Sequence, residues 1–294
     1  MPKVSIIMNC HNCGDYLQEA LDSVSRQTFR DYEIIFWDNQ STDNSAQIAK
    51  SFGAPLRYFR GESFLPLGEA RNKAIGEAQG KYIALLDCDD VWLPEKLEKQ
   101  IFFLENNPEI DLVFSDCYIS SDSTPKGATF FDEYKPFQEN IFFNLLTRYN
   151  FIPCLTAVLK KDKYDLIGGF DSSLTIAEEY DLFLRFTHKY KAFCLANPLA
   201  VYRKHQNCFT FTHWEKDIEE KLYVIEKNIR LLEGVSKEEA GQFKNKVCML
   251  FLSNLNILLK RFRFKQAIKY SCSYAKKYRQ LLNHINYLAR KRLS

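Results

Sequence analysis

The chain has 294 residues, which is enough for one large domain with an appendage but not for two full-sized domains. Hydrophobic residues form 46% and aromatic residues 15% of the sequence, a composition that excludes an intrinsically disordered protein. The net charge of +3 conceals a division, because residues 1–239 carry all 37 acidic residues with 27 basic ones, whereas residues 240–294 carry 13 basic residues and no acidic one.

The N-terminus and the longest apolar run indicate where in the cell the protein is expected. The first eight residues have the pattern of a strand and lack the apolar stretch and cleavage site of a signal peptide, so we expect a cytoplasmic protein. No run reaches the ~20 apolar residues that span a bilayer. The best candidate, residues 247–259, is short and interrupted by polar residues.

Strand and helix patterns alternate over residues 1–118, which predicts an α/β fold with a mostly parallel sheet and helices on both faces. The predicted strands are residues 3–8, 32–37, 55–60, 81–86 and 110–117. The predicted helices are residues 14–26, 42–52, 67–79 and 94–106. Small and polar residues between 119 and 135 predict a loop.

The pattern changes after residue 136. It predicts an aromatic helix at 137–149, a short strand near 155–159, a turn at 168–171 and a helix at 178–189. After residue 213 the chain is predicted to be helical to its end. The aromatic residues of 136–158 are expected to belong mainly to the core.

Carboxylates follow two of the predicted strands. Asp38 ends one strand, and Asp87, Asp89 and Asp90 follow another. Ligands of an open α/β sheet bind beyond the carboxyl ends of its parallel strands, so these side chains are expected to share one site. Oxygen ligands favour Mg²⁺ or Mn²⁺, and such an ion suits a diphosphate. Asp90 is also a candidate to cap or orient the helix that follows.

Other charged residues are candidates for the same site. Arg71 lies on the predicted helix 67–79, where its guanidinium either binds a phosphate or base or forms a structural salt bridge with one of the carboxylates. Glu178 and Glu179 open the helix 178–189, where the helix dipole favours an ionised carboxylate. Asp181 is expected to pair with Arg185, four residues later.

The nine cysteines, an odd number read as scattered without Cys-x-x-Cys pairs, predict reduced thiols rather than a disulfide framework or a zinc site. Cys10, Cys13 and Cys88 fall near the predicted carboxylate site. We expect them to be small packing residues.

Six segments of the chain, covering roughly residues 3–205, resemble in order the inverting nucleotide-sugar glycosyltransferases of family 2, which have the GT-A fold. These segments are Val4-Ser5-Ile6-Ile7 with Asn9 and Asn12, Asp38-Asn39-Gln40-Ser41-Thr42-Asp43, Glu69-Ala70-Arg71-Asn72-Lys73-Ala74, Leu86-Asp87-Cys88-Asp89-Asp90, Gly168-Gly169-Phe170-Asp171, and Glu178-Glu179-Tyr180-Asp181-Leu182-Phe183-Leu184-Arg185.

The resemblance implies a role for each donor-site residue. Asp38 would read the nucleoside, Asp87 would contact the ribose, and Asp89 would bind the metal. Asn9 would join the nucleotide-sugar site. Arg71 would be a binding residue rather than a catalytic one.

The resemblance also implies a metal-shell residue and a base. His205 follows a Tyr-Arg-x-His-like segment, so it would complete the metal shell or contact the diphosphate. Glu179 would be the general base, with Glu178 as the runner-up. Relatives usually have Asp at the position of Glu179.

The resemblance implies metal-dependent inverting transfer of a sugar from a nucleotide donor, with a UDP-sugar as the expected donor. The expected acceptor is a hydroxyl of a glycan or lipid-linked acceptor in surface polysaccharide or lipopolysaccharide synthesis. Residues 1–213 would form the catalytic domain, with 1–118 binding the nucleotide sugar and 119–213 facing the acceptor. Residues 214–294 would form a basic helical extension.

The sequence also bears on two other functions. A sugar nucleotidyltransferase needs a glycine-rich loop after its first strand, but residues 8–14 contain only Gly14. A donor-binding scaffold without turnover is the other alternative, suggested by Glu at position 179.

Basic and aromatic residues alternate in the segment 240–294. This pattern favours an amphipathic helix at an anionic membrane surface, which would place the protein at the inner face of the cytoplasmic membrane. The alternative is that the segment packs on the acidic body or on a second subunit, and the second of these would give an oligomer. No nucleic-acid partner is expected, because no recognition motif is present.

Overall fold

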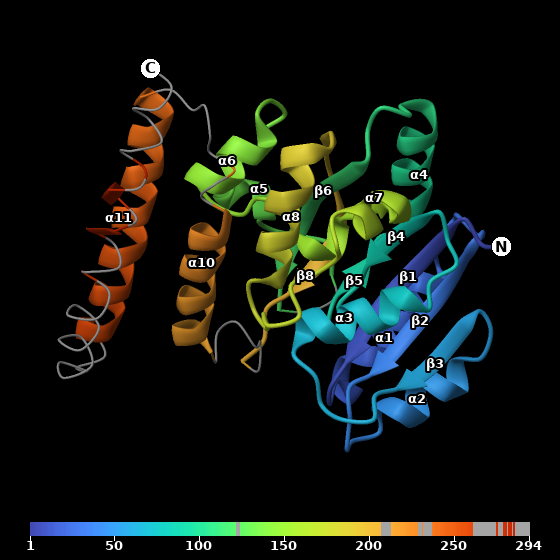
Figure 1. Cartoon of the computed structure of the whole chain (residues 1–294). Helices are drawn as coiled ribbons and strands as arrows, with labels where there is room; N and C mark the ends of the chain where they lie inside the picture. Colours follow the sequence, from blue (N-terminus) through green and yellow to red (C-terminus); the bar gives the residue numbers. More distant parts are fainter. Residues whose placement is uncertain are drawn as a thin grey trace. The chain divides into compact units, whose positions relative to one another are not determined.

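Figure 1 shows the protein as a computed structural model, which describes residues 1–121, 124–206, 213–228, 231 and 237–260, and isolated positions between 275 and 285. The chain divides into two compact units. The first comprises residues 1–141 and 150–212, and the second comprises residues 142–149 and 213–294. The assignment of donor and acceptor roles to residues 1–118 and 119–213 stays a prediction.

The first unit is built on an eight-stranded sheet with the order β3-β2-β1-β4-β7-β6-β8-β5. The strands are β1 (Val4–Cys10), β2 (Tyr32–Asp38), β3 (Leu56–Arg60), β4 (Tyr82–Leu85), β5 (Val91–Trp92), β6 (Leu112–Ser120), β7 (Val158–Lys160) and β8 (Ala192–Arg203). β7 and β5 run against the other strands, which share one direction. The predicted mostly parallel sheet is confirmed.

Helices cover both faces of this sheet. They are α1 (Gly14–Ser25), α2 (Ser45–Phe52), α3 (Leu67–Gly76), α4 (Lys96–Asn106), α5 (Phe130–Glu133), α7 (Lys161–Leu166) and α8 (Glu178–Lys189), with the short 3₁₀ helix η1 (Cys154–Thr156). The connections β1-α1-β2 and β3-α3-β4 advance in opposite directions along the sheet. Right-handed crossovers therefore place α1 and α3 on opposite faces, as the α/β prediction required.

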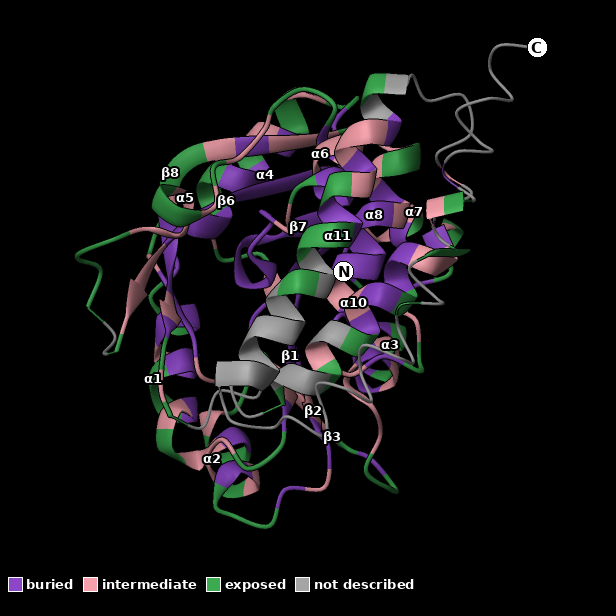
Figure 2. Ribbon diagram, turned by 90° about the vertical axis from the view of Figure 1, so that its left-hand side faces the viewer, coloured by how far each residue is buried: buried purple, intermediate pink, exposed green. Residues whose placement is uncertain are grey.

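Alternating side chains of the central strands build the core. Val4, Ile6 and Met8 of β1 lie in one buried cluster with Leu17 and Leu21 of α1. The intervening residues of β1 point to the other face because side chains alternate along a strand. Buried residues, purple in Figure 2, line the sheet and the helix faces packed on it.

Two strands were missing from the prediction. β8 contains Pro198, which lies at a register shift opposite Asp116 of β6. A proline within a strand is confined to an edge or an irregularity and masks the strand pattern in the sequence. β5 has only two residues, too few for an alternating pattern.

The segment 119–160 departs from the prediction in three places. β6 continues to Ser120 and α5 follows at Phe130, so residues 119–135 are not wholly a loop. The helix predicted from residue 137 begins only at Ile141, as α6 (Ile141–Thr147). Gln138 instead exchanges hydrogen bonds with the backbone of Cys194 in β8. The strand predicted at 155–159 is shortened because η1 occupies its first half.

The second unit contains most of α6 with α10 (Trp214–Asn228) and α11 (Lys237–Lys260). Lys246 of α11 is buried and donates a hydrogen bond to the carbonyl of Leu145, with an Nζ–O distance of 2.9 Å. Of the helices the structure describes, none is long and apolar enough to cross a membrane. Most of the predicted amphipathic tail, residues 261–294, lies outside the described residues.

Candidate active site

The carboxylates that follow β2 and β4 lie at the same edge of the sheet. β1 lies between β2 and β4 and is parallel to both, so Asp38 at the end of β2 and Asp87 just beyond β4 flank the end of β1. The strand order reverses between β1 and β4, which is the position where an open α/β sheet leaves a crevice for ligands. The local sequence thus places the acids at the switch point of the fold.

Asp38 is fully buried, and both of its oxygens have partners. Oδ2 accepts hydrogen bonds from the Tyr58 hydroxyl at 2.5 Å and the Arg60 guanidinium at 2.7 Å, and Oδ1 accepts one from the Ser41 amide at 2.7 Å. Burial alone would raise the pKa of Asp38, but these hydrogen bonds and the Arg60 charge lower it below its usual value. Asp38 is therefore held as a carboxylate.

Arg71 joins three separate elements. Its buried guanidinium donates from Nη2 to Oδ1 of Asp87 at 2.7 Å and from Nη1 to Oε1 of Glu178 at 2.5 Å. These contacts match the structural alternative, a salt bridge with the site carboxylates. Arg71 on α3 thereby ties the turn after β4 to the first residue of α8.

Glu178 and Glu179 have different environments although they are neighbours. The Glu178 side chain is 3% exposed and is held by Arg71. Glu179 accepts a hydrogen bond from the Asn150 amide, with an Nδ2–Oε1 distance of 3.2 Å. Burial and the adjacent Glu178 charge raise the pKa of Glu179 to about 7, although Arg71 opposes the shift. A carboxylate with this pKa suits a general base at neutral pH.

Asp89 and His205 meet from distant parts of the sequence. His205 follows β8, and its Nε2 lies 3.0 Å from Oδ2 of Asp89. The ring of Tyr16 on α1 packs against the imidazole, with a centroid distance of 4.6 Å. Burial and the charge of Asp87 raise the pKa of Asp89, which His205 partly counters.

The donor set at this position fits a divalent cation. The side chain of Asp89 is 32% exposed and that of Asp87 is 38% exposed, so both carboxylates retain open surface. Burial and then the charge of Asp87 raise the pKa of Asp89, and a bound cation would oppose both effects by stabilising the ionised carboxylate. Carboxylate oxygens with one imidazole suit Mn²⁺ or Mg²⁺.

Asp90 does not cap the following helix, so that expectation was wrong. Asp90 is buried, and its Oδ1 accepts a hydrogen bond from the backbone amide of Arg203 at 2.9 Å. Burial and the charges of Asp89 and Asp87 raise the pKa of Asp90 well above its usual value. Helix α4 begins only at Lys96. Asp90 instead anchors the end of β8, two residues before His205.

Asn9 lies near the end of β1. The nitrogen and oxygen of its side chain are buried, and neither has a hydrogen-bond partner within the described part of the chain. A buried amide without a hydrogen-bond partner costs free energy of folding. A polar ligand at the switch point could supply the missing partner, so this side chain is suited to bind one. The expected pair of Asp181 and Arg185 is also present, with an N–O distance of 2.7 Å, and it is structural.

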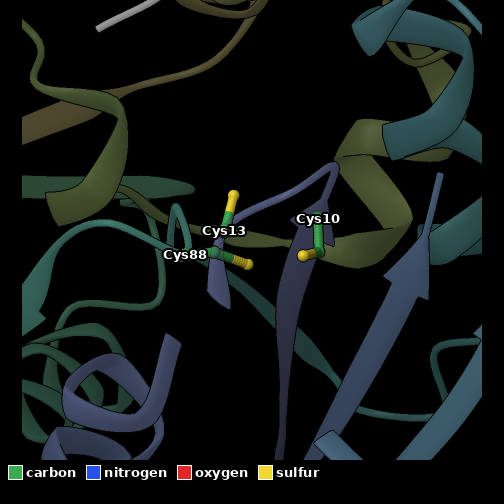
Figure 3. Close-up of side chains that lie close together, drawn as sticks. All are labelled: Cys10, Cys13 and Cys88. Atoms are coloured by element: carbon green, nitrogen blue, oxygen red, sulfur yellow. The ribbon is translucent and has the colours of Figure 1, made fainter. Parts of the chain in front are cut away.

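Three thiols form a cluster that the sequence prediction overlooked. Cys10 ends β1, Cys13 precedes α1, and Cys88 lies between Asp87 and Asp89 (Figure 3). Their sulfur atoms all lie within 4.8 Å of one another. The spacing Cys10-His11-Asn12-Cys13 is a Cys-x-x-Cys signal that was available in the sequence.

Comparison with known proteins decides the family. The family described as Glycosyl transferase family 2 matches residues 5–167, more than half of the chain. The chain belongs to glycosyl transferase family 2. The uncharacterized glycosyltransferase MJ1057 of Methanocaldococcus jannaschii is 32% identical over 244 residues, which cover 73% of this chain and 80% of the relative.

Two other similar proteins have names or titles that state a substrate or ligand. The UDP-Glc:alpha-D-GlcNAc-diphosphoundecaprenol beta-1,3-glucosyltransferase WfgD of Escherichia coli is 30% identical over 183 residues, 62% of this chain and 68% of the relative. The mannosyltransferase PcManGT of Pyrobaculum calidifontis, solved with GDP-Man and Mn²⁺, is 17% identical and has a TM-score of 0.62. That likeness covers 99% of this chain and 87% of PcManGT, and it shows that this family 2 protein has the GT-A fold.

Proposed function

We propose that this family 2 glycosyltransferase is a metal-dependent inverting enzyme that moves a sugar from a nucleotide-diphospho-sugar to a hydroxyl of a glycan or lipid-linked acceptor. The observation that carries the proposal is the Arg71 bridge, which connects Asp87 of the donor site to Glu178. The next residue, Glu179, has a pKa of about 7 and is the proposed base. The buried guanidinium of Arg71 thus links the proposed donor site to the residue that precedes the proposed base.

The relatives support a choice of substrates. WfgD takes UDP-Glc and a diphosphoundecaprenol-linked acceptor, according to its name, whereas PcManGT was solved with GDP-Man. We propose a UDP-sugar donor here, because WfgD is the more similar in sequence, and a role in surface polysaccharide synthesis. Asp38 and Asn9 are the proposed nucleoside contacts, and Asp87 the proposed ribose contact.

The proposed reaction assigns a step to each residue. Glu179 accepts the proton of the acceptor hydroxyl as its oxygen bonds to the anomeric carbon, while the nucleoside diphosphate departs from the opposite face. The configuration of that carbon is therefore inverted. Asp89 and His205 would hold Mn²⁺ or Mg²⁺, which supplies charge neutralisation for the leaving diphosphate. Arg71 keeps α8 against the donor site.

Thermal unfolding with nucleotides tests the proposal without an acceptor. UDP or a UDP-sugar is added with Mn²⁺ at a concentration of about 100 times the dissociation constant of that nucleotide. Binding should then raise the free energy of unfolding by ~2.7 kcal/mol. EDTA should remove most of this effect, because the ion that Asp89 and His205 would hold supplies the charge that neutralises the diphosphate. GDP, CDP and dTDP serve as matched controls. An absent shift with every nucleotide would contradict a nucleotide-sugar donor site, whereas a shift without any transfer activity would favour the scaffold alternative.

The pH dependence of transfer should follow Glu179. Its proton is lost as pH rises through about 7, so the rate should climb up to about that pH and then level. Glu178, Arg71, Cys154 and Asp87 are the charged or titratable groups that act on it. Glu178→Gln removes a neighbouring negative charge and should move the midpoint to lower pH. A midpoint that stays fixed in this variant would assign the titration to another group.

The basic tail suggests a location. We propose that residues 240–294, which carry no acidic residue, contact an anionic membrane surface at the inner face of the cytoplasmic membrane. This contact would bring the enzyme close to a lipid-linked acceptor. A second subunit remains the alternative partner for the tail.

A further inference from the structure

The thiol cluster at the edge of the donor site has a defined geometry. Cys10 and Cys88 are 1% and 2% exposed, and Cys13 is partly exposed. Figure 3 shows the Cys10 and Cys88 side chains directed toward each other, with Cys13 beside them. The three residues come from the end of β1, the loop after it and the turn after β4, so the fold itself brings them together.

The separations of the sulfurs suit a metal ion. A tetrahedral ion with Zn–S bonds of ~2.3 Å holds its sulfurs about 3.8 Å apart. The observed limit of 4.8 Å requires an approach of only about 1 Å. A disulfide needs only two sulfurs at ~2.0 Å and leaves the third unexplained. Three sulfur atoms this close together therefore favour coordination.

We propose that Cys10, Cys13 and Cys88 form a three-sulfur site for a soft, thiolate-binding metal ion such as Zn²⁺. Thiolates select such ions over Mg²⁺ and Mn²⁺, which prefer the oxygen ligands at Asp89. The fourth coordination position is open to water or a small ligand. This ion is separate from the one that the donor diphosphate requires.

Hydrogen bonding within the cluster agrees with a site that forms readily. Hydrogen bonds from Cys13 and then Cys88 lower the pKa of Cys10, and the hydrogen bond with Cys10 raises the pKa of each of its partners. Coordination by all three sulfurs requires their deprotonation, so metal binding should release protons.

An ion at this position would also act on the donor site. Cys88 separates Asp87 from Asp89, so holding its sulfur fixes the backbone that carries both carboxylates. His11, between the other two cysteines, contacts the carbonyl of Asn39 beyond β2, with an Nδ1–O distance of 2.9 Å. This consequence rests on the proposed function, whereas the metal site itself does not.

Cobalt titration of the reduced, full-length protein tests the proposal. One equivalent of Co²⁺ should produce a sulfur-to-cobalt charge-transfer band and the visible bands of a tetrahedral ion. Zn²⁺ should abolish both, and Mn²⁺ should not. Cobalt at the carboxylates gives no sulfur band, so this readout is independent of donor binding. Absence of the band would overturn the proposal.

Single cysteine variants locate the ion. Cys13→Ser should weaken Co²⁺ binding by more than ~100-fold, since even partners behind the direct ligands cost 10–100-fold. Cys88→Ser should do the same and serves if the first variant does not fold. Cys248→Ser, which removes an exposed thiol of α11, is the matched control and should bind normally. Unchanged binding in both cluster variants would overturn the site, as would loss of two thiols to a disulfide in air without any metal band.

Discussion

Replacing Glu179 by glutamine should reduce sugar transfer by ~10²–10⁴-fold while leaving nucleotide-sugar binding near that of the wild type. Glutamine keeps the size of the side chain and the hydrogen bond to Asn150 but has no site for the transferred proton. Transfer from a UDP-sugar to a synthetic GlcNAc-diphospho-lipid measures the first quantity. Thermal stabilisation by UDP with Mn²⁺ measures the second.

Two control variants separate this role from a structural one. Glu109→Gln changes an exposed carboxylate before β6 and should leave transfer unchanged. Glu178→Gln removes one partner of the buried Arg71, so it should lower the melting temperature as well as transfer. Normal transfer in Glu179→Gln, combined with a loss in a stably folded Glu178→Gln, would assign the base to Glu178.

Asp89→Asn should reduce transfer by roughly 10³-fold, because the carboxylate is the proposed metal ligand and the ion stabilises the leaving group by several kcal/mol. The amide is nearly isosteric but carries no charge. Stabilisation by UDP should become insensitive to Mn²⁺ and EDTA. Calorimetric titration with Mn²⁺ in the presence of UDP gives the matching loss of affinity.

The controls for Asp89 lie on neighbouring elements. Asp15→Asn on α1 changes an exposed carboxylate and should retain full metal dependence. His205→Asn should give a smaller loss than Asp89→Asn, since it removes a neutral ligand. Wild-type metal dependence in Asp89→Asn would exclude this residue from the metal site.

The sequence predicted well those elements whose pattern is local. Helix α8 begins and ends where predicted because its charged first turn and apolar face are contained in twelve residues. The position of Asp38 and Asp87 at the same edge of the sheet followed from strand order alone. By contrast, β8 has a proline at a register shift, and its pairing with β6 is a tertiary feature that no local pattern records.

The chemistry of individual side chains was less predictable. Arg71 had several possible partners in the sequence, and only the packing of α3 against α8 selects Asp87 and Glu178. The pKa of Glu179 depends on burial and on a like charge one residue away, so it needs coordinates. The thiol cluster combines a visible Cys-x-x-Cys spacing with Cys88, which is distant in sequence.

The Arg71 bridge has a consequence for the construction of chimeric transferases. A chimera that exchanges donor and acceptor preferences would be built from sequence segments. The predicted division into a donor half and an acceptor half suggests a junction between residues 87 and 178. Such a junction would leave Arg71 with one native carboxylate and one foreign partner. A functional hybrid should therefore inherit α3, the turn after β4 and the start of α8 from the same parent.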